Sequence, residues 1–585
     1  MLRSKLTLSI AILLNALVGS AFAAVTFDTI ALTGSSGTTL GFGPGLGAGV
    51  DFASFDNAFL NSNGDVAFVG TVAGTGVVAS NDTGIWSRVG GPLTVIAREG
   101  VGGPNPNLGA GVYLSVIHPN PVLDANGKIT YSGNLAGTGI DSSNQYGIWT
   151  TAAGLTVTNA RSGTDSEPNV GPGVSFESFS VSGSPFYYAR PIVNASGHLA
   201  FFARLTGTGV NPSNNEGIWS NASGSLTPTV RTGSEGPGLN GGATAYFTQV
   251  REPVLNADGK IAFYGALAGT AVNTSNDTGI WTKSGGNLVT VAREGSDGPW
   301  PNLGAGVTFS SSFNLRTGFT NIALNDVGNV AFYGFVAGPG ITLANDTGIW
   351  SDVGGSLTVV AREGADGPTP NLGSDIYFGQ FDYRASLDFN AAGEIAFKGT
   401  LTGTLVNSSN NTGIWSNAAG VLTPIARTGS DGPGPNLGPG IYFGDLSNPA
   451  LNSQGDVAFL ALLFGNGINS SNDVGLWVNA GGTLQKIVRD GDLFDVDPGI
   501  NADLRTISSI TILDPALESA ERFFNDSGML AFELRFTDGS RGIFTAIVPE
   551  PNCAALIFCG AGLLILTRRF RGQENLETIT RTVDR

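Results

Sequence analysis

The sequence is poor in the residue types that most often build catalytic and metal centres. Its 585 residues include two cysteines and two histidines, and only 13% of them are charged. Both cysteines, Cys553 and Cys559, lie in an apolar stretch near the C-terminus. Residues 24–547 therefore have no cysteine, which excludes disulfides, thiolate metal sites and cysteine nucleophiles from this part of the chain.

A histidine-rich metal site or a serine triad is hard to build from His118 and His198 alone. His198 follows the glycine of a repeated turn, at a position where other copies have Asp, Lys, Asn or Glu. We therefore expect it to be a solvent-facing turn residue. His118 lies in the stretch VIHPNP, which occurs once and predicts no role.

Basic residues are also few. The chain has 29 Lys and Arg against 46 Asp and Glu, which gives a net charge of −17. Such an acidic surface repels nucleic acid and anionic lipid, so we expect neither as a partner. The composition suits a soluble extracellular protein and would allow it to bind cations.

Long apolar runs are confined to the two ends of the chain. At the N-terminus, Arg3 and Lys5 precede an apolar stretch over residues 6–18 and the small-residue motif Ala21-Phe22-Ala23. This order is typical of a secretory signal peptide. It predicts that signal peptidase removes residues 1–23 during export.

Glycine is abundant, with 87 residues, and 41% of the chain is hydrophobic. A glycine-rich, apolar and weakly charged chain indicates many short strands joined by tight turns. Its dominant feature is an internal repeat. Gly-Ile-Trp or a close variant recurs every 62 to 70 residues, with its aromatic residue at Trp86, Trp149, Trp219, Trp281, Trp350, Trp415, Trp477 and Phe544.

Two further markers recur in step with this tripeptide. In eight copies, Asn or Asp, two variable residues and Gly precede a short apolar strand, as in LNSNGDVAF from residue 60. This is the chemistry of a type I turn that closes a hairpin. After each tryptophan comes a small-residue turn and a strand that ends in Arg, as in GGPLTVIAREG from residue 90.

Each unit of about 65 residues thus contains four short strands, as a β-propeller blade does. A linear β-solenoid and a string of small sandwiches are the alternatives. The eighth unit lacks the Arg-bearing strand, whereas residues 30–34 match that strand without its Arg. We predict an all-β protein in which residues 24–547 form an eight-bladed propeller closed by the N-terminal strand, because closure leaves no exposed sheet edge.

The repeated arginines could line a central channel and bind an anion. We favour pairing with acidic groups or turn carbonyls inside each blade, because catalytic residues are seldom present in every blade. These residues are Arg98, Arg161, Arg231, Arg293, Arg362, Arg427 and Arg489.

Acidic loops offer two sets of calcium candidates, since calcium takes several oxygen ligands from flexible loops. One loop, RDGDLFDVDPG from residue 489, contains Asp490, Asp492, Asp495 and Asp497, although its spacing differs from an EF-hand. The loops before Gly-Ile-Trp contain Asp82, Asp277, Asp346 and Asp473. A solvated loop is the alternative for both sets, and we expect no other cofactor.

Trp300 is the one tryptophan outside the repeat position. It lies between two prolines in GPWPNLG, where related loops have Asn105, Thr369 and Gly434. An aromatic side chain held in this way could stack on a sugar ring or cover a neighbouring loop. Carboxylates for glycoside hydrolysis abound, but no pair is set apart from the repeat.

The stretch VPEPNCAALIFCGAGLLILTRRFRG, residues 548–572, resembles the PEP-CTERM sorting domain of Gram-negative bacterial surface proteins. The resemblance implies a single hydrophobic C-terminal helix in the inner membrane, recognition by an exosortase and transfer of the body to the outer surface. The 15-residue apolar run is short for an ordinary span, and the basic cluster would hold residues 573–585 in the cytoplasm. The matching residues are Pro549, Glu550, Pro551, Arg568, Arg569 and Arg571.

Together these features predict an exported, monomeric and non-enzymatic propeller with a structural, adhesive or binding role. Its expected location is the cell envelope or a biofilm matrix, and its expected partners are exopolysaccharide or matrix proteins. The alternatives are an extracellular carbohydrate-active enzyme and a calcium-dependent carbohydrate-binding propeller.

Overall fold

The computed structural model describes residues 24–549, apart from residues 105, 107, 153, 164–167, 180–190, 234–244, 285, 297, 311–318, 382–386, 499–501 and 514–522. The predicted signal peptide lies outside these residues. So do the predicted C-terminal helix and every residue of the predicted sorting motif except Pro549. The chain divides into two compact units, and one of them, Phe27–Ala546, contains almost all of the described residues.

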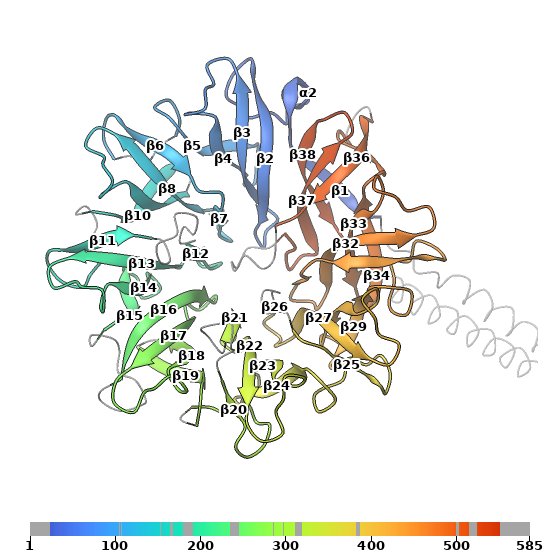
Figure 1. The fold of residues 1–585 in the computed structure, drawn as a ribbon. Helices are drawn as coiled ribbons and strands as arrows, with labels where there is room; N and C mark the ends of the chain where they lie inside the picture. The colour runs from blue at the N-terminus through green and yellow to red at the C-terminus, as the bar shows by residue number, and fades with distance from the viewer. Residues whose placement is uncertain are drawn as a thin grey trace, which may run out of the picture. The chain divides into compact units, whose positions relative to one another are not determined.

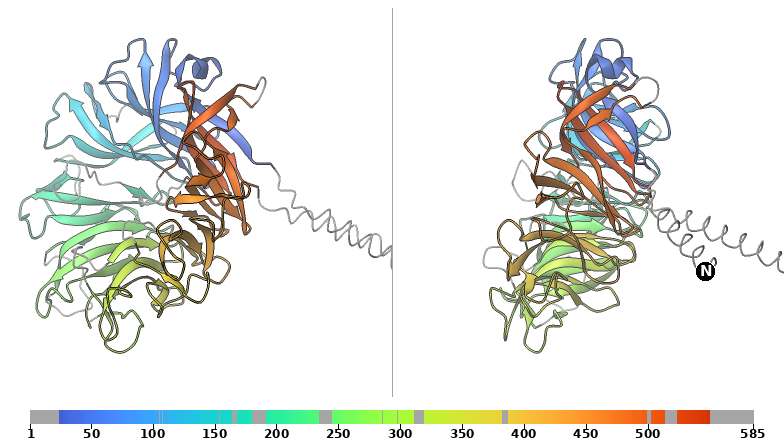
Figure 2. Two further views of the ribbon diagram at one scale, coloured as in Figure 1. Left: turned by 45° about the vertical axis from the view of Figure 1, so that its right-hand side comes forward. Right: turned by 90° about the vertical axis from the view of Figure 1, so that its right-hand side faces the viewer.

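Eight sheets of four or five strands build this unit, and they are arranged in a ring around a centre (Figure 1). Figure 2 shows the same ring of sheets from two further sides. The eight-bladed prediction is therefore confirmed. Blades are numbered in chain order.

The strands of blades 1 to 4 are β2 (Val50–Leu60), β3 (Val66–Gly74), β4 (Thr83–Arg88) and β5 (Thr94–Arg98); β6 (Val112–Ile117), β7 (Val122–Leu123), β8 (Ile129–Gly137), β9 (Tyr146–Ala152) and β10 (Leu155–Arg161); β11 (Val174–Ser178), β12 (Ile192–Val193), β13 (Leu199–Gly207), β14 (Glu216–Ser220) and β15 (Thr227–Arg231); and β16 (Tyr246–Leu255), β17 (Ile261–Ala268), β18 (Thr278–Ser284) and β19 (Asn287–Arg293).

The strands of blades 5 to 8 are β20 (Thr308–Phe309), β21 (Phe319–Leu324), β22 (Val330–Ala337), β23 (Thr347–Ser351) and β24 (Thr358–Arg362); β25 (Ile376–Phe378), β26 (Leu387–Phe389), β27 (Ile395–Gly403), β28 (Thr412–Ser416) and β29 (Thr423–Arg427); β30 (Ile441–Leu446), β31 (Ala450–Leu451), β32 (Val457–Gly465), β33 (Val474–Ala480) and β34 (Thr483–Arg489); and β35 (Leu493–Asp495), β36 (Leu504–Thr511), β37 (Met529–Phe536), β38 (Arg541–Ile547) and β1 (Thr26–Leu32). A short helix, α2 (Gly34–Thr39), follows β1.

The ring closes as the sequence predicts. β1 occupies the outer position next to β38 in blade 8, so the first strand of the chain completes its last sheet. Thr33 N donates to Arg541 O at 2.9 Å, and Arg541 N donates to Thr33 Oγ1 at 2.8 Å. Ile30, Ala31 and Leu32 are buried. β1 therefore covers the edge that β38 would otherwise expose.

Each repeated tryptophan lies in the apolar core between its own blade and the preceding one. Trp86 is fully buried, stacks on Phe68 with ring centroids 6.3 Å apart, and meets Phe52 edge-on at 4.9 Å. Its Nε1–H donates to Pro44 O at 3.0 Å. The same bond joins Trp219 to Pro168, Trp350 to Pro301, Trp415 to Pro370 and Trp477 to Pro435.

This bond explains the proline loops of the sequence. The loop proline accepts from the tryptophan of the blade that follows it, and the next residue, as at Asn302 and Asn371, has a positive φ near 57°. An asparagine tolerates this left-handed conformation better than most residues.

Among the described residues, no helix is long and apolar enough to span a membrane.

Candidate functional site

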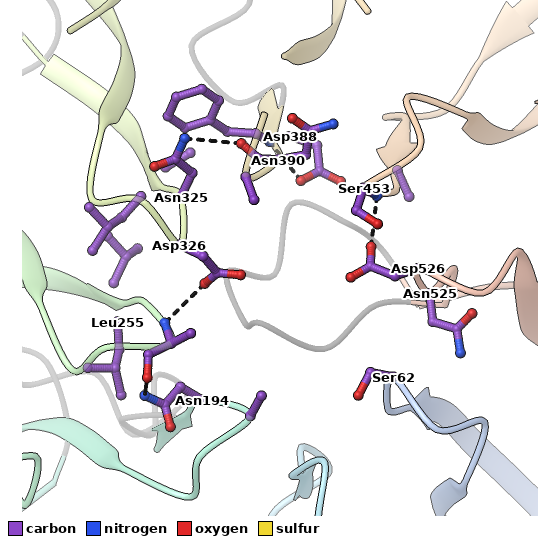
Figure 3. A pocket seen from close by; sticks show the side chains of 18 of the residues that line it. Ser62, Asn194, Leu255, Asn325, Asp326, Asp388, Asn390, Ser453, Asn525 and Asp526 are labelled. Atoms are coloured by element: carbon purple, nitrogen blue, oxygen red, sulfur yellow. Dashed lines mark hydrogen bonds between the residues drawn. The ribbon is translucent and has the colours of Figure 1, made fainter. Parts of the chain in front are cut away.

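The centre of the ring is the main cavity of the described part of the chain. It has a volume of about 280 Å³ and is lined by the Asn or Asp turns that precede β3, β8, β13, β17, β22, β27, β32 and β37 (Figure 3). The turns hold themselves in shape: Asn61 Oδ1 accepts from Asn63 N at 3.0 Å and from Asp65 N at 2.9 Å. This leaves the side-chain amide nitrogen to bond elsewhere.

That nitrogen bonds to the next blade. Asn194 Nδ2, for example, donates to Asn256 O at 2.7 Å, 62 residues further along the chain. We call this set of contacts the asparagine ring. Its other members are Asn61 to Asp124 O, Asn256 to Asn325 O, Asn325 to Asn390 O, Asn390 to Asn452 O, and Asn525 to Asn61 O.

Two junctions differ from this pattern. Asn452 Nδ2 donates to Asp456 Oδ2, but Ser453 N donates to Asp526 Oδ1 at 2.7 Å and so joins blades 7 and 8. In blade 2 the turn has Asp124, which has no side-chain donor. Asp124 Oδ2 is buried and has no hydrogen-bond partner among the described residues.

The residues that line the cavity are neutral or acidic. No lysine, arginine or histidine is among its described lining residues. Asp326 and Asp526 follow the turn asparagine in blades 5 and 8 and reach toward the cavity from different blades (Figure 3). Each holds a backbone N–H of the preceding blade, since Ala257 N donates to Asp326 Oδ1 at 3.0 Å and Ser453 N to Asp526 Oδ1.

Five of the seven repeated arginines bond through Nε to a turn carbonyl of their own blade. Arg427 Nε donates to Asn410 O at 2.9 Å, and Arg161, Arg231, Arg293 and Arg362 make the same bond to the corresponding asparagine. None of the seven is among the described lining residues of the cavity. Pairing with turn carbonyls is thereby confirmed for these five.

The loops before Gly-Ile-Trp are held by asparagine as well. Asn276 Oδ1 accepts from Asn273 N at 2.8 Å, and its Nδ2 donates to Ala271 O at 3.0 Å. The same pair of bonds is made by Asn81, Asn144, Asn214, Asn345, Asn410 and Asn472. The backbone oxygens of Asp82, Asp277, Asp346 and Asp473 accept from the neighbouring strand.

The four predicted loop aspartates bond to separate local groups. Asp490 Oδ1 accepts from Val474 N at 2.8 Å, and burial raises the pKa of Asp490. Asp492 Oδ2 accepts from Lys486 Nζ at 2.7 Å. Asp495 Oδ1 accepts from Asp497 N at 3.1 Å. Among the described residues, no group of three or more His, Cys, Asp or Glu side chains is placed to hold a metal ion.

Trp300 is 52% exposed, whereas the other seven tryptophans are at most 2% exposed. Its Nε1–H donates to Ser296 O at 3.3 Å, and the next residue, Pro301, accepts from the buried Trp350. The loop is therefore fixed on both sides of an open aromatic ring.

Both histidines lie next to the end of a strand: His118 follows β6, and His198 precedes β13. His198 lies at the turn, as expected, but it is only partly exposed, and Asn194 Nδ2 lies 3.1 Å from its Nδ1. His118 is buried, its Nδ1 lies 2.8 Å from Ser132 Oγ, and burial lowers its pKa to about 4.

Three glutamates that follow the repeated arginines are also buried. Glu99 accepts from Ile117 N at 2.9 Å, and Glu363 accepts from Thr347 Oγ1 at 2.8 Å. Burial raises the pKa of both carboxyls. The third, Glu294, is fully buried.

One family model matches residues 28–164, 109–383 and 317–555, and it is described as a family of unknown function, DUF7453. The chain belongs to this family. No curated protein matches the chain.

Solved structures similar to this DUF7453 chain include other propellers and enzymes. The β-propeller domain of the Trilobed protease from Pyrococcus furiosus is 11% identical, with 76% of this chain and 100% of that chain covered and a TM-score of 0.35. Polysaccharide lyase Uly1 is 10% identical, with 85% and 90% covered and a TM-score of 0.29. The α-L-arabinanase of Penicillium chrysogenum is 9% identical, with 67% and 98% covered and a TM-score of 0.23. Such distant likeness carries no information on activity.

Proposed function

We propose that this protein is an exported, non-enzymatic binding propeller that displays a glycan-binding face on the cell envelope or in an extracellular polysaccharide matrix. The repeat is used for architecture: its Asn, Arg and Trp side chains bond within the scaffold. Trp300 interrupts the repeat and presents a half-exposed indole ring. This observation carries the proposal, because a rigid aromatic face can stack on a sugar without losing conformational freedom.

The route of export follows from the two ends of the sequence. Residues 1–23 have the order of a signal peptide, and residues 548–572 resemble an exosortase-sorted tail with Pro549, Glu550 and Pro551 as the motif. A cysteine-free body is consistent with an oxidising location outside the cytoplasm. Mass spectrometry of the mature protein should find an N-terminus at residue 24 and a C-terminus near residue 550. Intact ends in a cytoplasmic fraction would contradict the route.

Tryptophan fluorescence tests the binding proposal directly. Since Trp300 is the one half-exposed tryptophan, a bound sugar should change the emission and reduce acrylamide quenching. The variant Trp300→Asn, which installs the residue found at Asn105, should lose this response. The variant Trp477→Phe, which installs the residue found at Phe544 in blade 8, is the matched control and should keep it. A wild-type signal that no polysaccharide changes would contradict glycan binding at Trp300.

A carbohydrate-active enzyme is the second candidate, and the central cavity favours it. Asp326 and Asp526 depart from the Ala or Ser that follows the turn residue in the other blades, and both reach toward the same cavity. Most glycoside hydrolases use two carboxyl groups, one on each side of the glycosidic bond that is cleaved. Release of reducing sugar by the wild type, and its loss in Asp326→Asn and Asp526→Asn, would replace the non-enzymatic proposal with this one.

A further inference from the structure

One corner of blade 7 departs from the repeat at two neighbouring positions. Tyr442 on β30 pairs with Phe464 on β32. At the position of Phe464, the register gives the other blades small residues: Ala73, Ala136, Thr206, Ala268, Ala337 and Thr402. Two residues later, Asn466 replaces the threonine found at Thr75, Thr138, Thr208, Thr270 and Thr404.

A glycine of β30 makes room for the new ring. β30 has a bulge between Phe443 and Asp445, and the bulged residue is Gly444. A Cβ at Gly444 would collide with the Phe464 ring, so the ring lies against the backbone there. The corresponding bulges of blades 1 to 4 carry the side chains of Ala53, Ser115, Glu177 and Thr248. Blade 6 also has a glycine after the corresponding phenylalanine, Gly379, but has Thr402 in place of the aromatic ring.

The two rings form an open aromatic corner. Their centroids lie 6.4 Å apart, and their planes are inclined by 63°, which is an edge-to-face pair. Phe464 is 48% exposed and Tyr442 is half-buried. The part of the Phe464 ring that faces water buries no area within the fold and is therefore accessible to a ligand, at a position where other blades use alanine or threonine.

We propose that Tyr442, Phe464 and Asn466 form a second sugar-binding subsite, which takes a pyranose ring of an uncharged polysaccharide. This inference rests on the proposed glycan-binding function and extends it to blade 7. The aromatic pair offers an apolar surface for the C–H face of the sugar. The exposed Asn466 carboxamide offers one acceptor and two donors for its hydroxyls. The net charge of −17 disfavours an anionic chain.

Electrophoresis through gels that contain laminarin, dextran or galactomannan tests the subsite. A gel polysaccharide that binds the wild type will retard it. The variant Phe464→Ala installs the residue of blades 1, 2, 4 and 5, so it should fold as those blades do. Its affinity should fall about three- to tenfold, which is the effect of losing one aromatic contact. Gly444→Ser, which displaces the ring but keeps it, should have a similar effect.

Leu343→Ala is the matched control, because Leu343 is 86% exposed and lies on another blade. It removes exposed apolar surface and should leave the retardation unchanged. Equal retardation of the wild type and Phe464→Ala would overturn the subsite while leaving the proposed function intact. A wild type that none of these gels retards would overturn both. Circular dichroism of each variant checks that it has folded.

Discussion

Asn61 Nδ2 donates to the carbonyl oxygen of Asp124 at 2.9 Å, but Asp124 has no amide with which to continue the pattern to Asn194. Asp124 is 3% exposed, and its Oδ2 has no hydrogen-bond partner among the described residues. Blades 2 and 3 thus lack the asparagine-ring bond that joins blade 1 to blade 2 and blade 3 to blade 4.

Asp124→Asn should therefore stabilise the protein. The new amide would donate to Asn194 O, and the variant would remove a buried, unpaired carboxylate oxygen. We expect the free energy of unfolding to rise by about 1 kcal/mol, the net contribution of one hydrogen bond. Urea unfolding followed by circular dichroism measures it.

The opposite substitution is the control. Asn256→Asp removes the donor that reaches Asn325 O at 3.2 Å, and it should destabilise the protein by about 1–3 kcal/mol. If Asp124→Asn unfolds at lower urea concentration than the wild type, the asparagine ring does not stabilise the fold in the way described above.

The sequence predicts much of this fold because eight repeats of similar sequence each form a blade of similar structure. The spacing of Gly-Ile-Trp gives the blade count, and the match of residues 30–34 to the missing strand gives the closure. The contrast between repeated and unique residues also marks Trp300. These conclusions need only local patterns and the periodicity.

The asparagine ring could not be predicted in this way. A type I turn is sufficient to explain the asparagine at Asn61, because its Oδ1 holds the turn. The second bond, from Nδ2, joins residues 62 to 69 positions apart, or 464 between Asn525 and Asn61, and it depends on how neighbouring blades are rotated. Likewise, Phe464 is exceptional only once the register pairs it with Tyr442.

Removal of the closing strand should open the ring. A variant without residues 24–33 exposes sheet surface now covered by Ile30, Ala31 and Leu32. We expect the free energy of unfolding to fall by about 3–6 kcal/mol, since each buried aliphatic side chain contributes about 1.5–3 kcal/mol. Thermal unfolding and size-exclusion chromatography measure the loss and any association through the open edge.

A peptide of residues 26–33 added to this variant should restore part of the lost melting temperature. A peptide of the same composition in scrambled order is the control and should restore none. If the truncated protein melts at the temperature of the wild type, closure by β1 makes no contribution to stability.

Calcium removal should leave the stability unchanged. The Asp490 carboxylate accepts a hydrogen bond from Val474 N. In other blades a threonine hydroxyl accepts the same bond: Thr232 from Glu216 N at 3.1 Å and Thr428 from Thr412 N at 3.2 Å. An acceptor for a strand amide explains this aspartate without a metal. Melting curves with and without EDTA should therefore coincide. Asp490→Thr should change the free energy of unfolding by less than about 1 kcal/mol, the net contribution of one hydrogen bond, because threonine accepts the same bond in other blades. A fall in melting temperature with EDTA would restore the calcium hypothesis.

Acid should destabilise the protein through His118. Burial lowers the pKa of this imidazole to about 4 in the folded chain, against 6.5 in its ordinary state. Between these two values the unfolded chain binds more protons, so the free energy of unfolding falls as the pH falls, by up to about 1.4 kcal/mol per pH unit. From about one pH unit above 6.5 the residue is almost wholly neutral in both states, and its contribution becomes constant.

His118→Gln isolates this contribution, because glutamine retains a hydrogen-bonding group near Ser132 Oγ but does not titrate. The difference in free energy of unfolding between the wild type and His118→Gln should be constant from about pH 7 to pH 8. It should then shift steadily against the wild type as the pH falls from about 6.5 to 4.5. Urea unfolding at each pH gives this difference. A difference that stays the same over the whole range would show that His118 is protonated as readily in the folded chain as in the unfolded one.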